Sequence, residues 1–225
     1  MNNNEKNNVS VQVSAGQVRL EGNLSIPKAS RGIVLFAHGS GSSRHSPRNK
    51  YVAEVLQNAD IATLLIDLLT EQEEEVDVHT RHLRFDIGLL AQRLIGATDW
   101  LKQNSDTKGL NIGYFGASTG AAAALVAAAE RQKIVKAVVS RGGRPDLADL
   151  ASLSKVQAPT LLIIGGNDEP VIRMNKEAFE QLTNIEKNKK KIVIVPGATH
   201  LFEEPGKLEE VAQLAKDWFK SNFKI

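Results

Sequence analysis

The sequence GASTG at residues 116–120 is the part of the chain that most directly suggests chemistry. The largely apolar run Leu110–Phe115 precedes it, and small residues follow it as far as Glu130. Between a strand and a helix, G-x-S-x-G is typical of a nucleophile elbow, a tight turn that presents a serine oxygen at the end of a sheet. Glycine on both sides avoids collisions with neighbouring backbone at this strained turn. The context therefore predicts that Ser118 is a nucleophile, whereas the motif alone would indicate only a Gly/Ser turn.

A serine hydroxyl is a poor nucleophile at neutral pH, so a neighbouring base must accept its proton. Histidine is the usual base because its pKa lies near 7. Of the five histidines, His200 follows the last expected strand and is the predicted base. His38 also ends a strand, but its loop is the one expected to bind the oxyanion. The remaining three are interpreted as surface residues: His45, His79 and His82.

The base in turn needs a carboxylate that fixes its tautomer and stabilises its positive charge. Asp168 follows the strand that precedes the strand of His200, and it is the predicted partner. Asp146 and Asp149 are alternatives, but both are expected to lie within a helix.

Two backbone N–H groups should stabilise the developing oxyanion. One is expected to be the N–H of Thr119, directly after the nucleophile. The other is expected to be the N–H of Ser40, because the flanking Gly39 and Gly41 allow close approach of the backbone. The alternative interpretation of this loop is an ordinary Gly/Ser connection.

Arginines beside the same strand ends suggest that the substrate carries negative charge. Arg141 and Arg144 follow a strand, and a guanidinium matches a carboxylate in two parallel hydrogen bonds. Arg44 and Arg48 start from the loop after His38 and could reach the same opening. The alternative is that these arginines are solvated surface residues. Further contacts with the substrate are expected from His38, Gly39 and Gly41.

Alternating apolar residues at 9–13 and 18–26 predict an antiparallel pair of strands. Continuous apolar runs then predict strands buried on both faces. These are Ile33–Ala37, Ile61–Ile66, Leu110–Phe115, Ile134–Val139, Thr160–Ile164 and Ile192–Val195. Helices are expected at Lys50–Ala59, Thr80–Asn104, 119–131, Pro145–Leu153, Arg173–Thr183 and Gly206–Phe223.

This alternation predicts an α/β fold with a mostly parallel twisted sheet of about eight strands, the first two antiparallel, and helices on both faces. Ligands bind such sheets at the carboxyl ends of the strands. The loops that carry Ser118, Asp168, His200 and His38 all begin there, so we expect them to meet. The short segment between Val139 and Thr160 leaves no room for a sizeable lid.

The chain has 225 residues, of which 42% are hydrophobic and 24% charged, which suits one domain at 9–225. Residues 1–8 are expected to form a disordered tail, and the acidic run Glu71–Asp77 a solvated loop. The net charge of +2 gives no argument for nucleic acid or membrane as a partner. The absence of cysteine excludes disulfides and thiolate chemistry. No signal peptide is evident, so a cytoplasmic protein is expected, either a monomer or a homodimer.

Taken together, these motifs resemble the α/β-hydrolase superfamily, and within it the small capless dienelactone-hydrolase-like proteins. The matching pieces are HGSGSSRHSPRN at 38–49, GASTG at 116–120, GGNDEPV at 165–171 and ATHLFEEPG at 198–206, with the chain order Ser, Asp, His. The resemblance implies a serine hydrolase that forms an acyl-enzyme on a small ester or lactone and uses no cofactor. No metal is expected either, because the sequence has no H-x-x-x-H pair. Dienelactone hydrolases use a cysteine nucleophile, which this chain lacks, so dienelactone itself is not the expected substrate.

Two alternatives to ester hydrolysis remain open on the same sequence. The triad could serve acyl transfer or the cleavage of amides and peptides. The scaffold could also belong to a binding protein without catalysis, although such a role does not need Ser118, Asp168 and His200 together.

Overall fold

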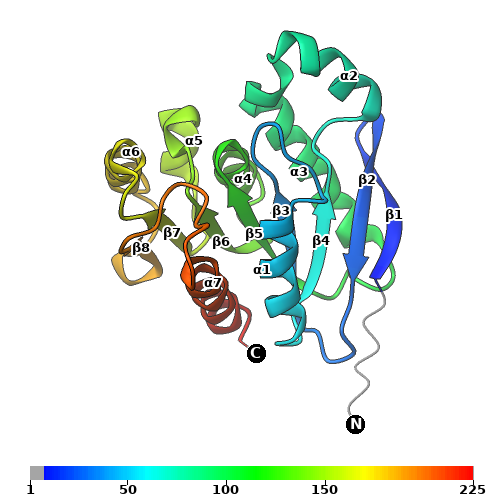
Figure 1. Cartoon of the computed structure of the whole chain (residues 1–225). Coiled ribbons are helices and arrows are strands. Elements are labelled where there is room, and N and C mark those ends of the chain that lie inside the picture. Colours follow the sequence, from blue (N-terminus) through cyan, green and yellow to red (C-terminus); the bar gives the residue numbers. More distant parts are fainter. Residues whose placement is uncertain (1–7, 225) are drawn as a thin grey trace.

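The computed structural model describes residues 8–224, and eight strands in this part of the chain form one sheet (Figure 1). The strands are β1 (Asn8–Ala15), β2 (Val18–Ser25), β3 (Gly32–Ala37), β4 (Ala62–Ile66), β5 (Asn111–Ala117), β6 (Val135–Arg141), β7 (Thr160–Gly165) and β8 (Lys190–Val195). Their order across the sheet is β1-β2-β4-β3-β5-β6-β7-β8. Only β2 runs antiparallel to its neighbours, and every other adjacent pair is parallel. The expected fold class is confirmed.

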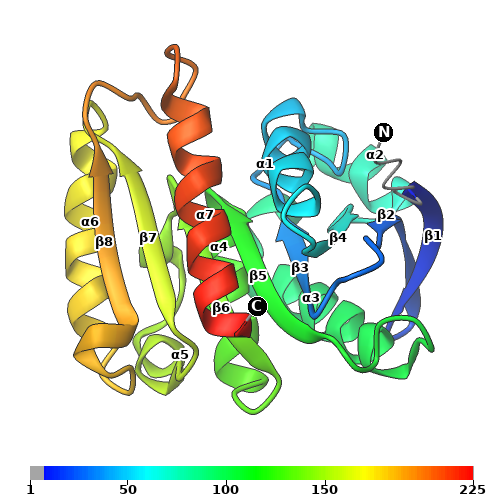
Figure 2. The ribbon, with the colours of Figure 1, turned by 90° about the horizontal axis from the view of Figure 1, so that it is seen from below.

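Helices cover both faces of the sheet (Figure 2). They are α1 (Pro47–Gln57), α2 (Glu71–Thr80), α3 (Ile87–Gln103), α4 (Thr119–Glu130), α5 (Leu150–Lys155), α6 (Glu169–Gln181) and α7 (Lys207–Phe223). The helices α1 and α7 pack on one face, and the helices from α3 to α6 pack on the other. Because both faces are covered, every residue of β3, β4 and β7 is buried, which explains their continuous apolar sequences.

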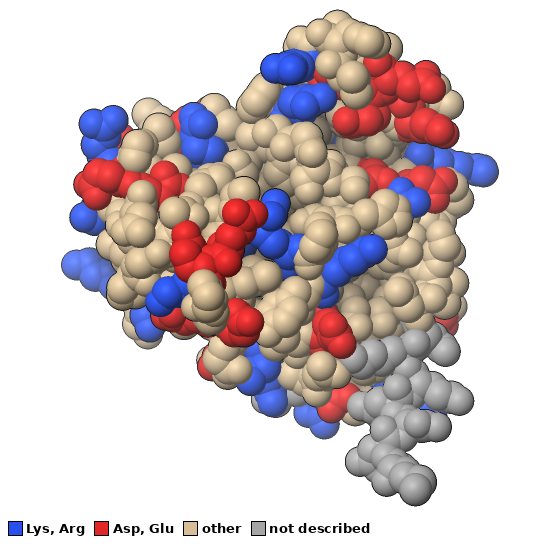
Figure 3. Space-filling model, in the orientation of Figure 1, with Lys and Arg blue, Asp and Glu red and all other residues tan. Residues whose placement is uncertain are grey.

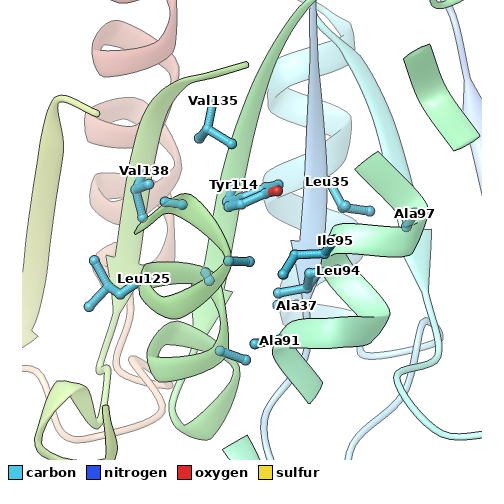
Figure 4. Close-up of a cluster of buried hydrophobic side chains, with 14 of the residues drawn as sticks. Leu35, Ala37, Ala91, Leu94, Ile95, Ala97, Tyr114, Leu125, Val135 and Val138 are labelled. Atoms are coloured by element: carbon cyan, nitrogen blue, oxygen red, sulfur yellow. The ribbon is translucent and has the colours of Figure 1, made fainter. Parts of the chain in front are cut away.

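The larger core lies between the sheet and the helices α3 and α4 (Figure 4). Leu35 of β3, Tyr114 of β5 and Leu94 of α3 belong to this cluster, and Leu125 of α4 lies on its other side, near Val138 of β6. The run of alanines in α4 is buried almost throughout, so this helix lies close to the sheet. The close packing fixes the start of α4, where Ser118 and Thr119 lie.

The acidic run at residues 71–77 is not the expected loop, because it forms most of α2. Thr70 caps this helix: its hydroxyl accepts the N–H of Glu73, and the Glu73 carboxylate accepts the N–H of Thr70. A threonine followed three residues later by glutamate is a known helix-start pattern, and the early carboxylates suit the positive end of the helix dipole. These local effects outweigh the repulsion between the carboxylates.

The long helix expected from residue 80 begins later. Arg81 ends α2 in the left-handed conformation, with φ of 56°. A short 3-10 turn then covers Leu83–Phe85, and the Asp86 side chain caps α3 by accepting the N–H of Leu89 at 2.9 Å. His79 and His82 therefore precede α3 rather than starting it.

Three other helices start at different places from those expected. The helix α1 starts at Pro47, three residues before the expected Lys50. The helix α6 starts directly after Asp168, four residues before the expected Arg173. The segment Pro145–Leu153 is divided into a 3-10 turn at Pro145–Leu147 and the short α5. These are all the elements between β6 and β7, which agrees with the expected absence of a sizeable lid.

The tail expected at 1–8 lies outside the described residues except for Asn8, which begins β1. Within residues 8–224, no helix is long and apolar enough to cross a membrane. Acidic side chains gather over α2, at the upper right of Figure 3, while both signs of charge are mixed over the rest of this face.

Candidate active site

Ser118 lies between β5 and α4 in a strained backbone conformation, with φ of 49° and ψ of −121°. Such values are rare for a residue with a side chain and persist only where the surroundings enforce them. A Cβ on Gly116 would lie 2.4 Å from the Cα of Ala121, and one on Gly120 would lie 2.3 Å from the carbonyl oxygen of Ala37. Both glycines are therefore required by close packing, as a nucleophile elbow demands.

The last residue of β6, Arg141, and the loop that follows it hold the elbow from the side. The N–H of Ser118 donates to the carbonyl of Arg141 at 3.2 Å, and the N–H of Arg144 donates to the carbonyl of Ser118 at 3.1 Å. The backbone strain at Ser118 is thus supported by two hydrogen bonds outside its own helix.

His200 and Asp168 form the pair that the sequence predicts. Nδ1 of His200 lies 2.6 Å from Oδ2 of Asp168, and the two loops are joined by the N–H of Asn167, which donates to the carbonyl of Ala198 at 2.9 Å. The Asp168 side chain is largely buried, at 14% exposed, and His200 is more open at 37%. This pairing directs the Nδ1 proton to the carboxylate and leaves Nε2 as the acceptor that a general base requires.

The other acidic candidates are engaged elsewhere. Arg144 holds Asp146 in a two-point ion pair, with both N–O distances at 2.8 Å. Asp149 caps α5 by accepting the N–H of Ser152 at 2.8 Å. Asp168 is the carboxylate that reaches His200.

In the part of the chain that the structure describes, no hydrogen bond joins the side chains of Ser118 and His200. Gly142 connects the surroundings of the two residues: it follows Arg141, whose carbonyl accepts the Ser118 N–H, and a Cβ on it would lie 3.5 Å from the Nδ1 and Cε1 atoms of His200. In ligand-free active sites such contacts are often long and tighten when substrate binds. The structure therefore joins Asp168 and His200, and the contact between His200 and Ser118 that a triad requires stays a prediction.

The loop after β3 passes directly over the nucleophile. A Cβ on Gly39 would lie 3.1 Å from the Cβ of Ser118, and Gly41 has a positive φ of 68°. Among the described residues, the N–H of Thr119 donates to no backbone carbonyl and is free to face an oxyanion. The N–H of Ser40, the other predicted donor, is instead bound to the hydroxyl oxygen of Thr119 at 2.9 Å. Sequence reasoning missed this contact, which joins residues 79 positions apart.

His38, which the sequence predicts to contact the substrate, has both ring nitrogens engaged within the protein. Its Nε2 accepts the N–H of Leu68 at 3.0 Å, and its Nδ1 lies 2.9 Å from the carbonyl of Gly39. Burial lowers the pKa of His38, so the imidazole is neutral at pH 7. It ties the loop at residues 38–43, which is expected to bind the oxyanion and is called the oxyanion loop below, to the segment that follows β4.

The four arginines near the opening differ in their partners. Arg144 forms an ion pair with Asp146, and Arg44 forms one with Asp67. Nη1 of Arg48 lies 3.2 Å from Oε1 of Glu203. Arg141 is the exception.

Arg141 is only 6% exposed, and within residues 8–224 its buried Nε and Nη1 atoms have no hydrogen-bond partner. Burial, assisted by the nearby charge of Arg48, lowers the pKa of Arg141 to about 10. Of the two arginines expected to bind substrate, Arg141 is the one whose guanidinium is free.

A groove of about 1030 Å³ runs between the oxyanion loop and α2. Its walls include Gly41, Arg44, His45, Thr70 and Glu74. It adjoins a small hollow of about 10 Å³ that Ser40 and Thr119 line. The groove therefore leads towards the oxyanion loop. Its other wall is α2, a helix that the sequence analysis did not predict. The capping pattern at Thr70 was the sequence signal that could have predicted this helix.

Comparison with known proteins agrees with this fold. Residues 22–224 match the sequence profile described as the Dienelactone hydrolase family. A crystal structure described as dienelactone hydrolase from Anabaena variabilis ATCC 29413 is 66% identical, with a TM-score of 0.93 over 97% of this chain and 99% of that one. Est1E from Butyrivibrio proteoclasticus, at 18% identity, has a TM-score of 0.77 over 96% of this chain and 99% of that one, which shows a shared fold.

One curated relative is much longer than this chain. A Mycobacterium tuberculosis protein named "Putative phosphoribosyl transferase" is 60% identical over 209 residues, which are 93% of this chain and 45% of that protein. This chain thus spans about half the length of that relative. The profile match over residues 22–224 decides the assignment: the chain belongs to the dienelactone hydrolase family and has an α/β-hydrolase fold.

Proposed function

We propose that this protein hydrolyses carboxylic esters through an acyl-enzyme on Ser118. His200 is the general base and Asp168 orients it. The observation that carries the proposal is the strained Ser118 elbow beside an imidazole whose Nδ1 is held 2.6 Å from a largely buried carboxylate.

The steps follow from this arrangement. Oγ of Ser118 attacks the ester carbonyl carbon while Nε2 of His200 takes the proton of that hydroxyl. The carbonyl electrons move onto the carbonyl oxygen and form a tetrahedral oxyanion. Collapse of this intermediate expels the alcohol, which receives the proton from His200. Water, deprotonated by the same imidazole, then attacks the acyl carbon. The bond to Oγ of Ser118 breaks, that oxygen takes the proton back from His200, and the acid is released.

Other reactions on the same residues are distinguished by the acceptor. An added alcohol or amine that diverts the acyl group would indicate transfer, and an amide substrate would test amidase or peptidase activity. The transferase name of the mycobacterial relative describes a protein of which this chain matches 45%, and the matched region is the one that fits the hydrolase family. We therefore assign hydrolase chemistry to this chain.

The preferred substrate of this hydrolase is proposed to be a small ester or lactone with a negative charge near the scissile bond. Arg141 supports this, because a buried guanidinium without a carboxylate partner is costly unless a ligand completes it. Arg144 is not proposed to share this role, because Asp146 already occupies its fork.

The test of the function is covalent labelling. A fluorophosphonate probe should add its mass to the peptide that contains Ser118, and acyl esters of varied length should be hydrolysed. Ser118→Ala is the control and should lose both properties. An active protein that is not labelled, or labelling that persists in Ser118→Ala, would overturn the proposal.

A further inference from the structure

The contact between Ser40 and Thr119 changes what the oxyanion site can offer. The N–H of Ser40 donates to the Thr119 hydroxyl oxygen at 2.9 Å, so that oxygen lies where an oxyanion would otherwise accept this N–H. Thr119 is 2% exposed and is the first residue of α4, directly after Ser118. Its hydroxyl is therefore a fixed part of the site.

Among residues 8–224, the proton of the Thr119 hydroxyl is not donated to any protein group. A hydroxyl has one O–H donor and two acceptor lone pairs. The Ser40 N–H occupies one lone pair, and the described residues include no hydrogen-bond acceptor for the Thr119 O–H. An accepted hydrogen bond also polarises the hydroxyl and makes its proton a better donor.

We propose that the Thr119 side chain is a catalytic hydrogen-bond donor to the oxyanion, and that the Ser40 N–H acts through it. In this arrangement Thr119 supplies both its free backbone N–H and its O–H, while Ser40 orients the hydroxyl. The hydroxyl stays neutral and no proton is transferred to the intermediate, so the proton and electron movements of the proposed reaction are unchanged. This inference rests on the proposed function of Ser118.

The matched variants are Thr119→Val, which keeps the branched shape and removes the hydroxyl, and Thr119→Ser, which keeps the hydroxyl. Loss of one oxyanion donor reduces kcat by about 100-fold or more in serine hydrolases. We expect a loss of that order in Thr119→Val on an oxygen ester, with KM little changed, and a rate within about threefold of wild type in Thr119→Ser.

A second substrate separates donation from a merely structural role. A thionoester replaces the carbonyl oxygen with sulfur, a weak acceptor, so an oxyanion donor contributes little to its hydrolysis. We therefore expect Thr119→Val to lose much less activity on the thionoester than on the matched oxygen ester. If the hydroxyl only anchors the Ser40 loop, both rates should fall by the same factor.

The outcomes are distinct. Equal losses on the two substrates, or a Thr119→Val variant as fast as wild type on the oxygen ester, would overturn the inference while leaving the proposed function intact. A wild-type protein that is neither labelled at Ser118 nor active on either ester would refute the proposed function, and the inference would fall with it. Melting temperatures of both variants, and a Thr119→Ala variant on both esters, guard against misfolding of the valine variant.

Discussion

Replacement of Arg141 by methionine tests whether its buried charge exists to bind substrate. Methionine approximates the length of the arginine stem but carries no charge. In a role that serves only the fold, an unpaired buried cation is unfavourable, so its removal should leave the melting temperature unchanged or raise it. In a binding role, the same change should weaken the transition state of an anionic ester alone.

The size of the effect follows from the lost contact. A hydrogen bond to a charged group contributes about 1.5–3 kcal/mol, which corresponds to roughly a 10- to 150-fold loss in kcat/KM. We expect this loss on an ester that carries a carboxylate, and less than about twofold on its neutral analogue. Arg144→Met is the matched control, because Asp146 already engages that guanidinium, and it should leave the ratio of the two rates unchanged.

The pH dependence gives a second readout of the same prediction. Burial lowers the pKa of Arg141 to about 10 from an ordinary value of 12.5, so the cation is complete at pH 7 and is lost as the pH rises through about 10. The preference for the charged ester should therefore decline above that pH. Because the two esters are compared on the same enzyme, titration of other groups largely cancels from the ratio. Equal activity on both esters, unchanged in Arg141→Met, would refute the reasoning.

Three further predictions concern the proposed catalytic residues His200 and Asp168 and the buried Asp77 of α2. His200→Ala should reduce kcat as severely as Ser118→Ala, and the double variant should be little worse because the two act as a unit; near-normal turnover in His200→Ala would contradict this. Asp168→Asn should lower kcat by orders of magnitude while the protein stays folded, and full activity in steady-state assays would point to another carboxylate. Asp77→Asn should destabilise the protein by about 1–3 kcal/mol at pH 7 in urea unfolding, because the inaccessible Asp77 carboxylate accepts hydrogen bonds from the Arg84 side chain and two backbone N–H groups. Burial alone would raise the pKa of Asp77, but these hydrogen bonds outweigh it and lower the pKa below 3.8. The difference in unfolding free energy between Asp77→Asn and wild type should therefore persist at neutral pH and shrink only as the pH falls below 3.8. A constant difference down to pH 2 would count against this account.

The fold was predictable because its signals are local. Strands buried on both faces require continuous apolar runs, and such runs appear at β3, β4 and β7. The elbow was predictable for the same reason: residues within a few positions of Ser118 must be glycine, or the turn collides with its own neighbours. The carboxyl ends of parallel strands share one edge, so the pairing of Asp168 with His200 also followed from strand order.

The expectation that failed locally was the acidic loop. Composition suggested a solvated segment, yet the capping box at Thr70 starts α2 there. The capping pattern is visible in the sequence, because Thr70 directly precedes the acidic run and Glu73 follows it by three residues. The consequence reaches the site, because α2 forms a wall of the groove beside the oxyanion loop.

The tertiary structure alone decided which polar groups are already occupied. The sequence placed Arg141 and Arg144 on the same loop as equal candidates, and only their surroundings show that one has a carboxylate partner and the other has none. It likewise named Ser40 and Thr119 as backbone donors without revealing that the hydroxyl of one accepts the N–H of the other. Backbone constraints act over a few residues and leave a pattern in the sequence. Hydrogen-bond partners are chosen among groups that folding brings together from distant positions, so their assignment requires the three-dimensional structure.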